Sequence, residues 1–96
     1  MCIVKFKELT VDLSKEECYS GSTKVNLTKT EFNLLAFLIN NIDKAFTRRD
    51  LLKSVWTNEA SLRAIDLAIS RLRRKLKDSS RYIKTKANYG YSFQST

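Results

Sequence analysis

The sequence predicts a small α+β domain in which an antiparallel sheet comes first, three helices follow and a β-hairpin ends the chain. Three observations indicate this class. Apolar residues alternate in short bursts over residues 3–26, capping motifs precede apolar runs with helical spacing, and two short strand patterns flank a turn near the C-terminus. The 96 residues allow one modest core but no second domain with its own cleft, so we expect one domain over residues 1–96.

The first segment, residues 1–27, is expected to form the sheet. Its apolar bursts are separated by residues 14–17 and 20–23, which both have the composition of turns. This spacing predicts a meander of three or four antiparallel strands.

The next segment, residues 28–80, is expected to hold the three helices. Thr28 and Glu31 have the spacing of a capping box and precede an apolar run, which predicts a largely buried helix over roughly residues 29–40. Residues 47–50 repeat the capping pattern, with Asp in place of Glu. A short second helix is therefore expected to follow them and to reach Trp56.

The third predicted helix, residues 62–77, carries the observation that matters most for function. At about 100° per residue, one side of this helix is a core stripe. The stripe consists of Ile65, Ile69, Leu72 and Leu76, with Ala68 at its edge. The opposite side is basic, small and mixed, and consists of Arg63, Ala64, Leu67, Ser70, Arg71 and Arg74. Residues 63–77 hold six basic side chains and one acidic one, which favours a polyanion partner.

The last segment, residues 81–96, is expected to form the β-hairpin. Residues 82–85 and 91–93 have the alternation of strands, and Gly90 is expected near the bend between them.

The positive charge lies in one half of the chain. Basic and acidic side chains cancel over residues 1–47, so the whole formal net charge of +8 belongs to residues 48–96. Such a patch steers association with a polyanion and releases counterions from a phosphate backbone. A solvated face that only keeps the protein soluble is the alternative that charge alone leaves open.

The same composition excludes most catalytic chemistry. Histidine is absent, and Cys2 and Cys18 have no second pair of ligands, so neither a zinc site nor a Cys–His nucleophile is expected. We therefore expect no enzyme activity and no cofactor. The sequence has neither an apolar run of transmembrane length nor a secretory signal, which predicts a cytoplasmic protein without a membrane partner.

Three helices, a basic outer face on the third and a following hairpin are the layout of a winged helix-turn-helix. In this layout the third helix lies in the major groove of DNA. Arg63, Arg73 and Arg74 are expected to bind phosphates, because a guanidinium fork matches phosphate oxygens. Arg71 is our candidate for a bidentate contact to guanine.

The small and apolar residues of this face also suit a DNA groove. Leu67 is expected to contact a thymine methyl group, and Ala64 to allow close approach. Leu67 can equally be one of the scattered apolar residues found on any protein surface.

Several linked motifs resemble the OmpR/PhoB-type DNA-binding domain of bacterial response regulators. They are LTKTEFNLL at 27–35, TRRDLL at 47–52, VW at 55–56, RAIDLAISRLRRKL at 63–76 and GYSF at 90–93. The resemblance implies a four-stranded N-terminal sheet, a trihelical core and a C-terminal wing. It also implies a receiver domain, phosphorylated by a sensor histidine kinase, which this chain does not contain.

Position by position, the resemblance assigns DNA contacts to one set of residues on the third helix. They are Arg63, Ala64, Leu67, Ala68, Arg71 and Arg73. It implies a phosphate contact for Trp56. The sequence itself is equally compatible with a buried packing role for this residue. It gives the loop at 57–62, with Asn58, Glu59 and Ser61, a contact to RNA polymerase. Asp66 is expected to form an internal ion pair with an Arg, since a carboxylate facing phosphate would repel it.

Two departures from the family pattern affect these expectations. The wing tip has Ala87 and Asn88 where the family has Arg and Gly, so Lys86 or Lys84 is expected to reach phosphate instead. Asn88 tolerates the left-handed backbone that Gly would supply. Ala68 and Ser70 stand where longer polar residues are common, which favours fewer direct hydrogen bonds and more shape readout.

Sequence-specific binding of double-stranded DNA is the favoured function. We expect two copies on neighbouring half-sites about one helical turn apart, as a dimer on DNA, and the family resemblance implies that these half-sites are direct repeats. A basic RNA-binding module and a protein-interaction winged helix are the alternatives. The first would display aromatic residues on an open sheet, and the second has little use for so many basic residues on one helix.

Overall fold

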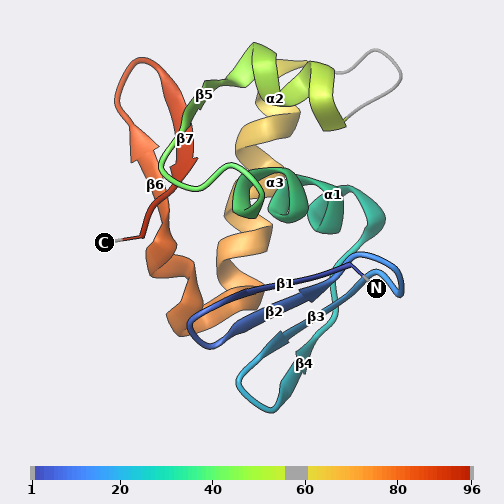
Figure 1. Cartoon of the computed structure of the whole chain (residues 1–96). Helices are drawn as coiled ribbons and strands as arrows, with labels where there is room; N and C mark the ends of the chain where they lie inside the picture. The colour runs from blue at the N-terminus through green and yellow to red at the C-terminus, as the bar shows by residue number, and fades with distance from the viewer. Residues whose placement is uncertain (1, 56–60, 96) are drawn as a thin grey trace.

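A computed structural model describes residues 2–55 and 61–95, and its N-terminal part is a four-stranded antiparallel sheet (Figure 1). The strands are β1 (Ile3–Phe6), β2 (Leu9–Asp12), β3 (Glu17–Ser20) and β4 (Thr23–Val25), in the order β1-β2-β3-β4. The predicted meander is confirmed, with four strands. Alternate residues of β2 and β3, among them Leu9, Val11 and Cys18, are buried in the core as the period of a strand requires.

The first helix, α1 (Lys29–Ile39), begins at the capping box that the sequence predicted. The Glu31 amide donates to Thr28 Oγ1 at 3.2 Å, and the Thr28 amide donates to Glu31 Oε1 at 3.0 Å. Two amides that would otherwise lack a partner at the helix start are thereby satisfied. The helix ends at Asn40, close to the predicted end.

The second helix, α2 (Arg48–Val55), begins at the second predicted cap. The Asp50 amide donates to Thr47 Oγ1 at 3.0 Å, and the Thr47 amide donates to Asp50 Oδ2 at 3.1 Å. Trp56, where this helix was expected to end, lies outside the described residues.

The third helix, α3 (Leu62–Leu76), lies behind α1 in Figure 1 and runs between the sheet and α2. It ends one residue before the predicted boundary, because Lys77 adopts a left-handed backbone with φ of 55°. A 3₁₀ segment, η1 (Lys77–Tyr82), follows and spans the boundary that we had expected between helices and hairpin.

The C-terminal hairpin consists of β6 (Ile83–Lys86) and β7 (Gly90–Phe93), and we call it the wing. It belongs to a three-stranded sheet of order β5-β7-β6, because β5 (Ala45–Thr47) pairs antiparallel with β7. The strand β5 was not predicted from the sequence. A strand of three residues carries too little alternation to be recognised without its distant partner.

Gly90 lies beside the bend, as predicted, and also has a role that was not predicted. It is the first residue of β7, not part of the bend, and a Cβ atom there would collide with the backbone of Phe46 in β5. The left-handed residue of the bend is Asn88, with φ of 62°. Glycine is therefore needed at position 90 for the close approach of two strands.

The core lies between the N-terminal sheet, α1, α3 and β7. Its fully buried side chains include Leu9, Leu34, Leu35, Leu38, Ile65, Ile69, Leu72 and Phe93. The core stripe predicted for the third helix is confirmed in full, including Ala68. Within residues 2–55 and 61–95, no helix combines the length and the apolar character needed to cross a membrane.

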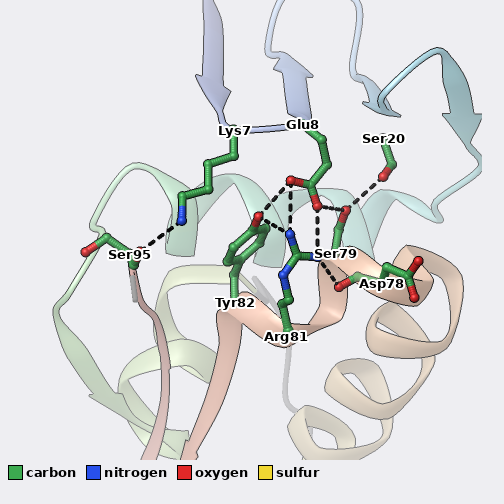
Figure 2. A network of polar contacts seen from close by, with 8 residues as sticks. All are labelled: Lys7, Glu8, Ser20, Asp78, Ser79, Arg81, Tyr82 and Ser95. Carbon is green, nitrogen blue, oxygen red and sulfur yellow. Dashed lines mark hydrogen bonds and ion pairs between the residues drawn. The ribbon is translucent and has the colours of Figure 1, made fainter.

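A polar network joins the N-terminal sheet to η1 (Figure 2). Glu8 accepts hydrogen bonds from the Tyr82 hydroxyl at 2.7 Å and the Ser79 hydroxyl at 2.8 Å, and pairs with Arg81 Nη1 at 3.1 Å. The hydroxyls of Ser79 and Ser20 share a further hydrogen bond of 2.8 Å. The hydrogen bond from Tyr82, with those from Ser79 and the nearby Arg81 charge, lowers the pKa of Glu8 to about 2. This network fixes the end of α3 on the sheet.

Candidate nucleic-acid interface

The outward side of α3 has the composition that the sequence predicted. We call it the α3 outer face, and it consists of Arg63, Ala64, Leu67, Ser70, Arg71 and Arg74. All of these residues are exposed except Ala64, which is half-buried. Leu67 is 47% exposed, which is high for a leucine at the centre of a basic surface. Within the described part of the chain, the three arginines of this face form no ion pair.

Ala68 does not belong to this face. It is 7% exposed and packs in the core, so the DNA-facing position that the resemblance implied for it is corrected. Its methyl group forms part of the wall of a hollow of about 240 Å³ between α1 and α3. The hollow is lined by Thr28, Thr30, Glu31, Ala64, Leu67, Ala68 and Arg71.

Arg73 also differs from its expected place. Its Nη2 atom donates to the Ile83 carbonyl at 3.0 Å and to Thr85 Oγ1 at 2.8 Å, and both acceptors lie on β6. We expected Arg73 to bind a phosphate, and in the structure its guanidinium reaches sideways to the wing. A helical wheel gives the direction of a Cβ atom but not where a side chain of this length ends.

Asp66 forms the internal ion pair that the sequence predicted. Its Oδ1 atom accepts hydrogen bonds from Arg48 Nε at 2.7 Å and from the Tyr91 hydroxyl at 2.6 Å. The hydrogen bond from Tyr91, followed by that from Arg48, holds the pKa of the Asp66 carboxyl below its usual value. The carboxylate is thereby kept charged and turned toward α2 and β7.

Lys75 forms an ion pair within the fold as well. Its Nζ atom lies 2.6 Å from Glu31 Oε1, and Glu31 is 3% exposed. Burial acts to raise the pKa of Glu31, but the hydrogen bonds from Lys75 and Thr28 outweigh it, and the pKa lies below its usual value. The basic residues of α3 thus divide into an outward set and a set that holds the fold together.

The wing tip presents small and polar residues and one aromatic ring. The Tyr89 amide donates to the Lys86 carbonyl at 2.9 Å and closes the turn. Asn88 has the left-handed backbone that we predicted for it, and Lys86 is half-buried. Tyr89 is 50% exposed. We did not select it as a candidate site residue, although an aromatic residue beside the predicted turn could have indicated an exposed ring.

The loop before α3 is described only at its end. Ser61 is exposed and stands at the N-cap of α3 without a side-chain capping bond. Trp56, Asn58 and Glu59 lie outside the described residues.

Comparison with known proteins identifies the family. The family model described as "Transcriptional regulatory protein, C terminal" matches residues 22–93. The chain belongs to this family. The KDP operon transcriptional regulatory protein KdpE of Escherichia coli (strain K12) is 40% identical over 96 residues, which cover 95% of this chain and 43% of KdpE. This chain spans about two fifths of the length of the curated relatives that it matches.

Solved structures agree with this family of transcriptional regulatory domains and with the winged-helix fold. The response regulator DrrB, a Thermotoga maritima OmpR/PhoB homologue, is 34% identical with a TM-score of 0.88, over 96% of this chain and 44% of DrrB. The Klebsiella pneumoniae RstA DNA-binding domain, solved in complex with the RstA box, is 31% identical with a TM-score of 0.85, over 100% of both chains. The family consists of transcription regulators and not of enzymes.

Proposed function

We propose that this chain is the DNA-binding domain of a two-component response regulator and binds double-stranded DNA at specific sequences to control transcription. The observation that carries this proposal is the α3 outer face, where three exposed arginines surround the apolar Leu67. A face of this kind suits the major groove, where cations meet phosphates and an apolar side chain meets the thymine methyl group. The RstA relative, solved with its DNA box, supports the same partner.

The roles proposed on α3 follow from position and chemistry. Arg63 and Arg74 lie near the two ends of the outer face and bind phosphates on either side of the groove. Arg71 lies closer to the centre and makes the bidentate contact to guanine. Leu67 contacts a thymine methyl group. Ser70 supplies a further hydrogen bond, and Ala64 lets the helix approach closely.

The wing is proposed to lie near the adjacent minor groove. Lys86 reaches a phosphate there, and Asn88 gives the turn its shape. Ala87 has replaced the arginine that the family resemblance would place at the tip, so the wing supplies affinity more than base readout.

Binding to a random pool of duplex DNA at about 150 mM salt tests the proposal. Sequencing of the bound fraction is expected to give a short motif repeated about one helical turn apart. The logarithm of affinity is expected to fall with the logarithm of salt concentration with a slope of about −4 to −6, from five to six phosphate contacts. Absence of any enriched motif, despite salt-sensitive binding, would favour an RNA-directed or non-specific basic domain.

The wider context is proposed on the family alone. We infer a bacterial cytoplasmic protein whose receiver domain is controlled by a sensor histidine kinase, and a dimer that forms on direct repeats. The segment with Asn58, Glu59 and Ser61 is proposed to contact RNA polymerase. Substitution of Glu59 by Lys tests this point, since it should leave DNA affinity unchanged or slightly higher and reduce transcription from a promoter that carries the selected site.

A further inference from the structure

We propose that Tyr91 and Asp66 are positioning residues, which set the angle between the wing and α3 so that both engage DNA as one rigid unit. The proposal rests on the DNA-binding function proposed above and concerns residues outside the α3 outer face. We call the group of Arg48, Asp66, Arg73, Thr85 and Tyr91 the helix–wing joint.

The joint connects α3 to both strands of the wing at two levels along the helix. Asp66 and Arg73 are seven residues apart, so they project from nearly the same side of the helix, about 20° from each other. At the upper level, Asp66 Oδ1 accepts the Tyr91 hydroxyl of β7 at 2.6 Å. Two turns along, Arg73 Nη2 donates to the Ile83 carbonyl and to Thr85 Oγ1 of β6. Both strands of the wing are therefore tied to the same face of α3.

The ring of Tyr91 lies close to two cations. The Cζ atoms of Arg48 and Arg73 are 5.8 Å and 5.6 Å from its centroid, within the range of a cation–π contact. Arg48 is the first residue of α2 and also donates to Asp66 at 2.7 Å. The joint thus includes α2, and a rotation of the wing would disturb contacts to both helices of the helix-turn-helix together.

The hydrogen bonds from Tyr91 and Arg73 lie between the packed base of the wing and its exposed tip. At the base, Ile83 pairs with Phe93, and both side chains are buried in the core. At the tip, residues 87–89 are exposed, and Figure 1 shows this turn standing clear of the three helices. The backbone of β7 is also paired with β5 as far as Gly90, so we infer that the side-chain ties near Tyr91 set the angle of this small sheet to α3 and do not hold the hairpin together.

Burial and charge make Tyr91 and Asp66, at the centre of the joint, unsuited to direct contact with DNA. Tyr91 is 6% exposed, and its hydroxyl proton is already given to Asp66. Asp66 would repel a phosphate if it approached one. These residues therefore act on DNA through the position of the wing and not by contact.

The test compares two duplexes that share the motif selected from the random pool. One duplex carries full flanks, and the other is shortened to remove the base pairs under the wing. For the unchanged protein, shortening is expected to reduce affinity about tenfold, which is what one charge-assisted hydrogen bond to a phosphate is worth. For Tyr91→Phe, which keeps the ring and removes only the hydroxyl, this ratio is expected to fall to about threefold or less.

Tyr19→Phe is the matched control. The Tyr19 hydroxyl donates to Glu17 Oε1 at 3.2 Å within β3, and this contact is remote from the joint. This variant is expected to keep the tenfold ratio. Thermal unfolding of both variants, followed by circular dichroism, shows whether the domain stays folded at the temperature of the binding assay.

A second variant tests Arg73 separately. On the shortened duplex, Arg73→Ala should leave the salt slope unchanged, since the guanidinium serves the wing, whereas loss of a phosphate ligand would reduce the slope by about 0.9. A Tyr91→Phe protein that is folded and keeps the tenfold ratio overturns the proposal, as does an equal loss of affinity on both duplexes. If the unchanged protein selects no motif at all, the proposed function fails instead.

Discussion

Replacement of Glu8 by Gln gives a direct measure of how the N-terminal sheet holds the end of α3. The change removes the charge and retains the shape of the side chain. The pKa of Glu8 falls from 4.5 to about 2 in the folded chain, which corresponds to at most about 3 kcal/mol of unfolding free energy at neutral pH. The side chain is 30% exposed, so solvent screening reduces the expected loss to about 1–2 kcal/mol.

The pH dependence makes this prediction sharper. Because the folded pKa is depressed, the stabilisation is fully present above pH 4.5 and is lost as the pH falls toward about 2. Urea unfolding followed by circular dichroism is expected to show the full difference between the two proteins at pH 7. The difference should shrink steadily below pH 4.5.

Glu16→Gln is the matched control for this experiment. Glu16 pairs with Lys29 at 2.7 Å, but the two side chains are 46% and 68% exposed. A surface pair of this kind contributes about 0–1 kcal/mol, so Glu16→Gln is expected to change stability by less than about 0.5 kcal/mol. A loss in Glu8→Gln that is the same at pH 7 and pH 3 would refute the reasoning, because it would trace the effect to packing and not to charge.

Three further predictions concern the interface and the wing. Arg71→Ala is expected to lose about 1–3 kcal/mol of discrimination between the selected motif and its single-base variants, whereas Arg74→Ala weakens all sequences alike, as competition binding will show. Lys86→Ala is expected to lower the salt slope by about 0.9 in binding assays at several salt concentrations, because one phosphate contact is lost. Gly90→Ala is expected to destabilise the domain by about 1–3 kcal/mol in urea unfolding, because the added methyl group meets the backbone of β5, and a neutral result would contradict the close approach of the two strands.

Local features of the fold were predictable from the sequence. Both capping motifs, at Thr28 and at Thr47, depend on side chains and amides three residues apart, and both occur where the spacing indicated. The core stripe and the outer face of α3 follow from the period of a helix alone. The ion pair of Asp66 was predictable because a carboxylate that faces phosphate would repel it, although Arg48 as its partner was not predictable.

The features that escaped prediction depend on contacts between distant segments. The strand β5 has three residues at the middle of the chain and is defined by its partner β7, which lies near the C-terminus. Arg73 reaches the wing because its side chain is long and acceptors on β6 happen to lie within reach. Neither acceptor can be recognised from the sequence around position 73, so the contact of Arg73 with the wing was not predicted.

Because β5 pairs with β7, the paired strands of the wing contribute to folding, whereas its turn does not pair with β5. Thr47 both ends β5 and caps α2, so the same backbone that aligns with Gly90 also starts the second helix. The turn at residues 87–89 takes no part in this arrangement. Its length and composition are therefore open to change at a smaller folding cost than the paired strands, as long as a residue that accepts a left-handed backbone replaces Asn88. A library of loops grafted between Lys86 and Gly90 would then yield domains that differ in DNA affinity and share one scaffold.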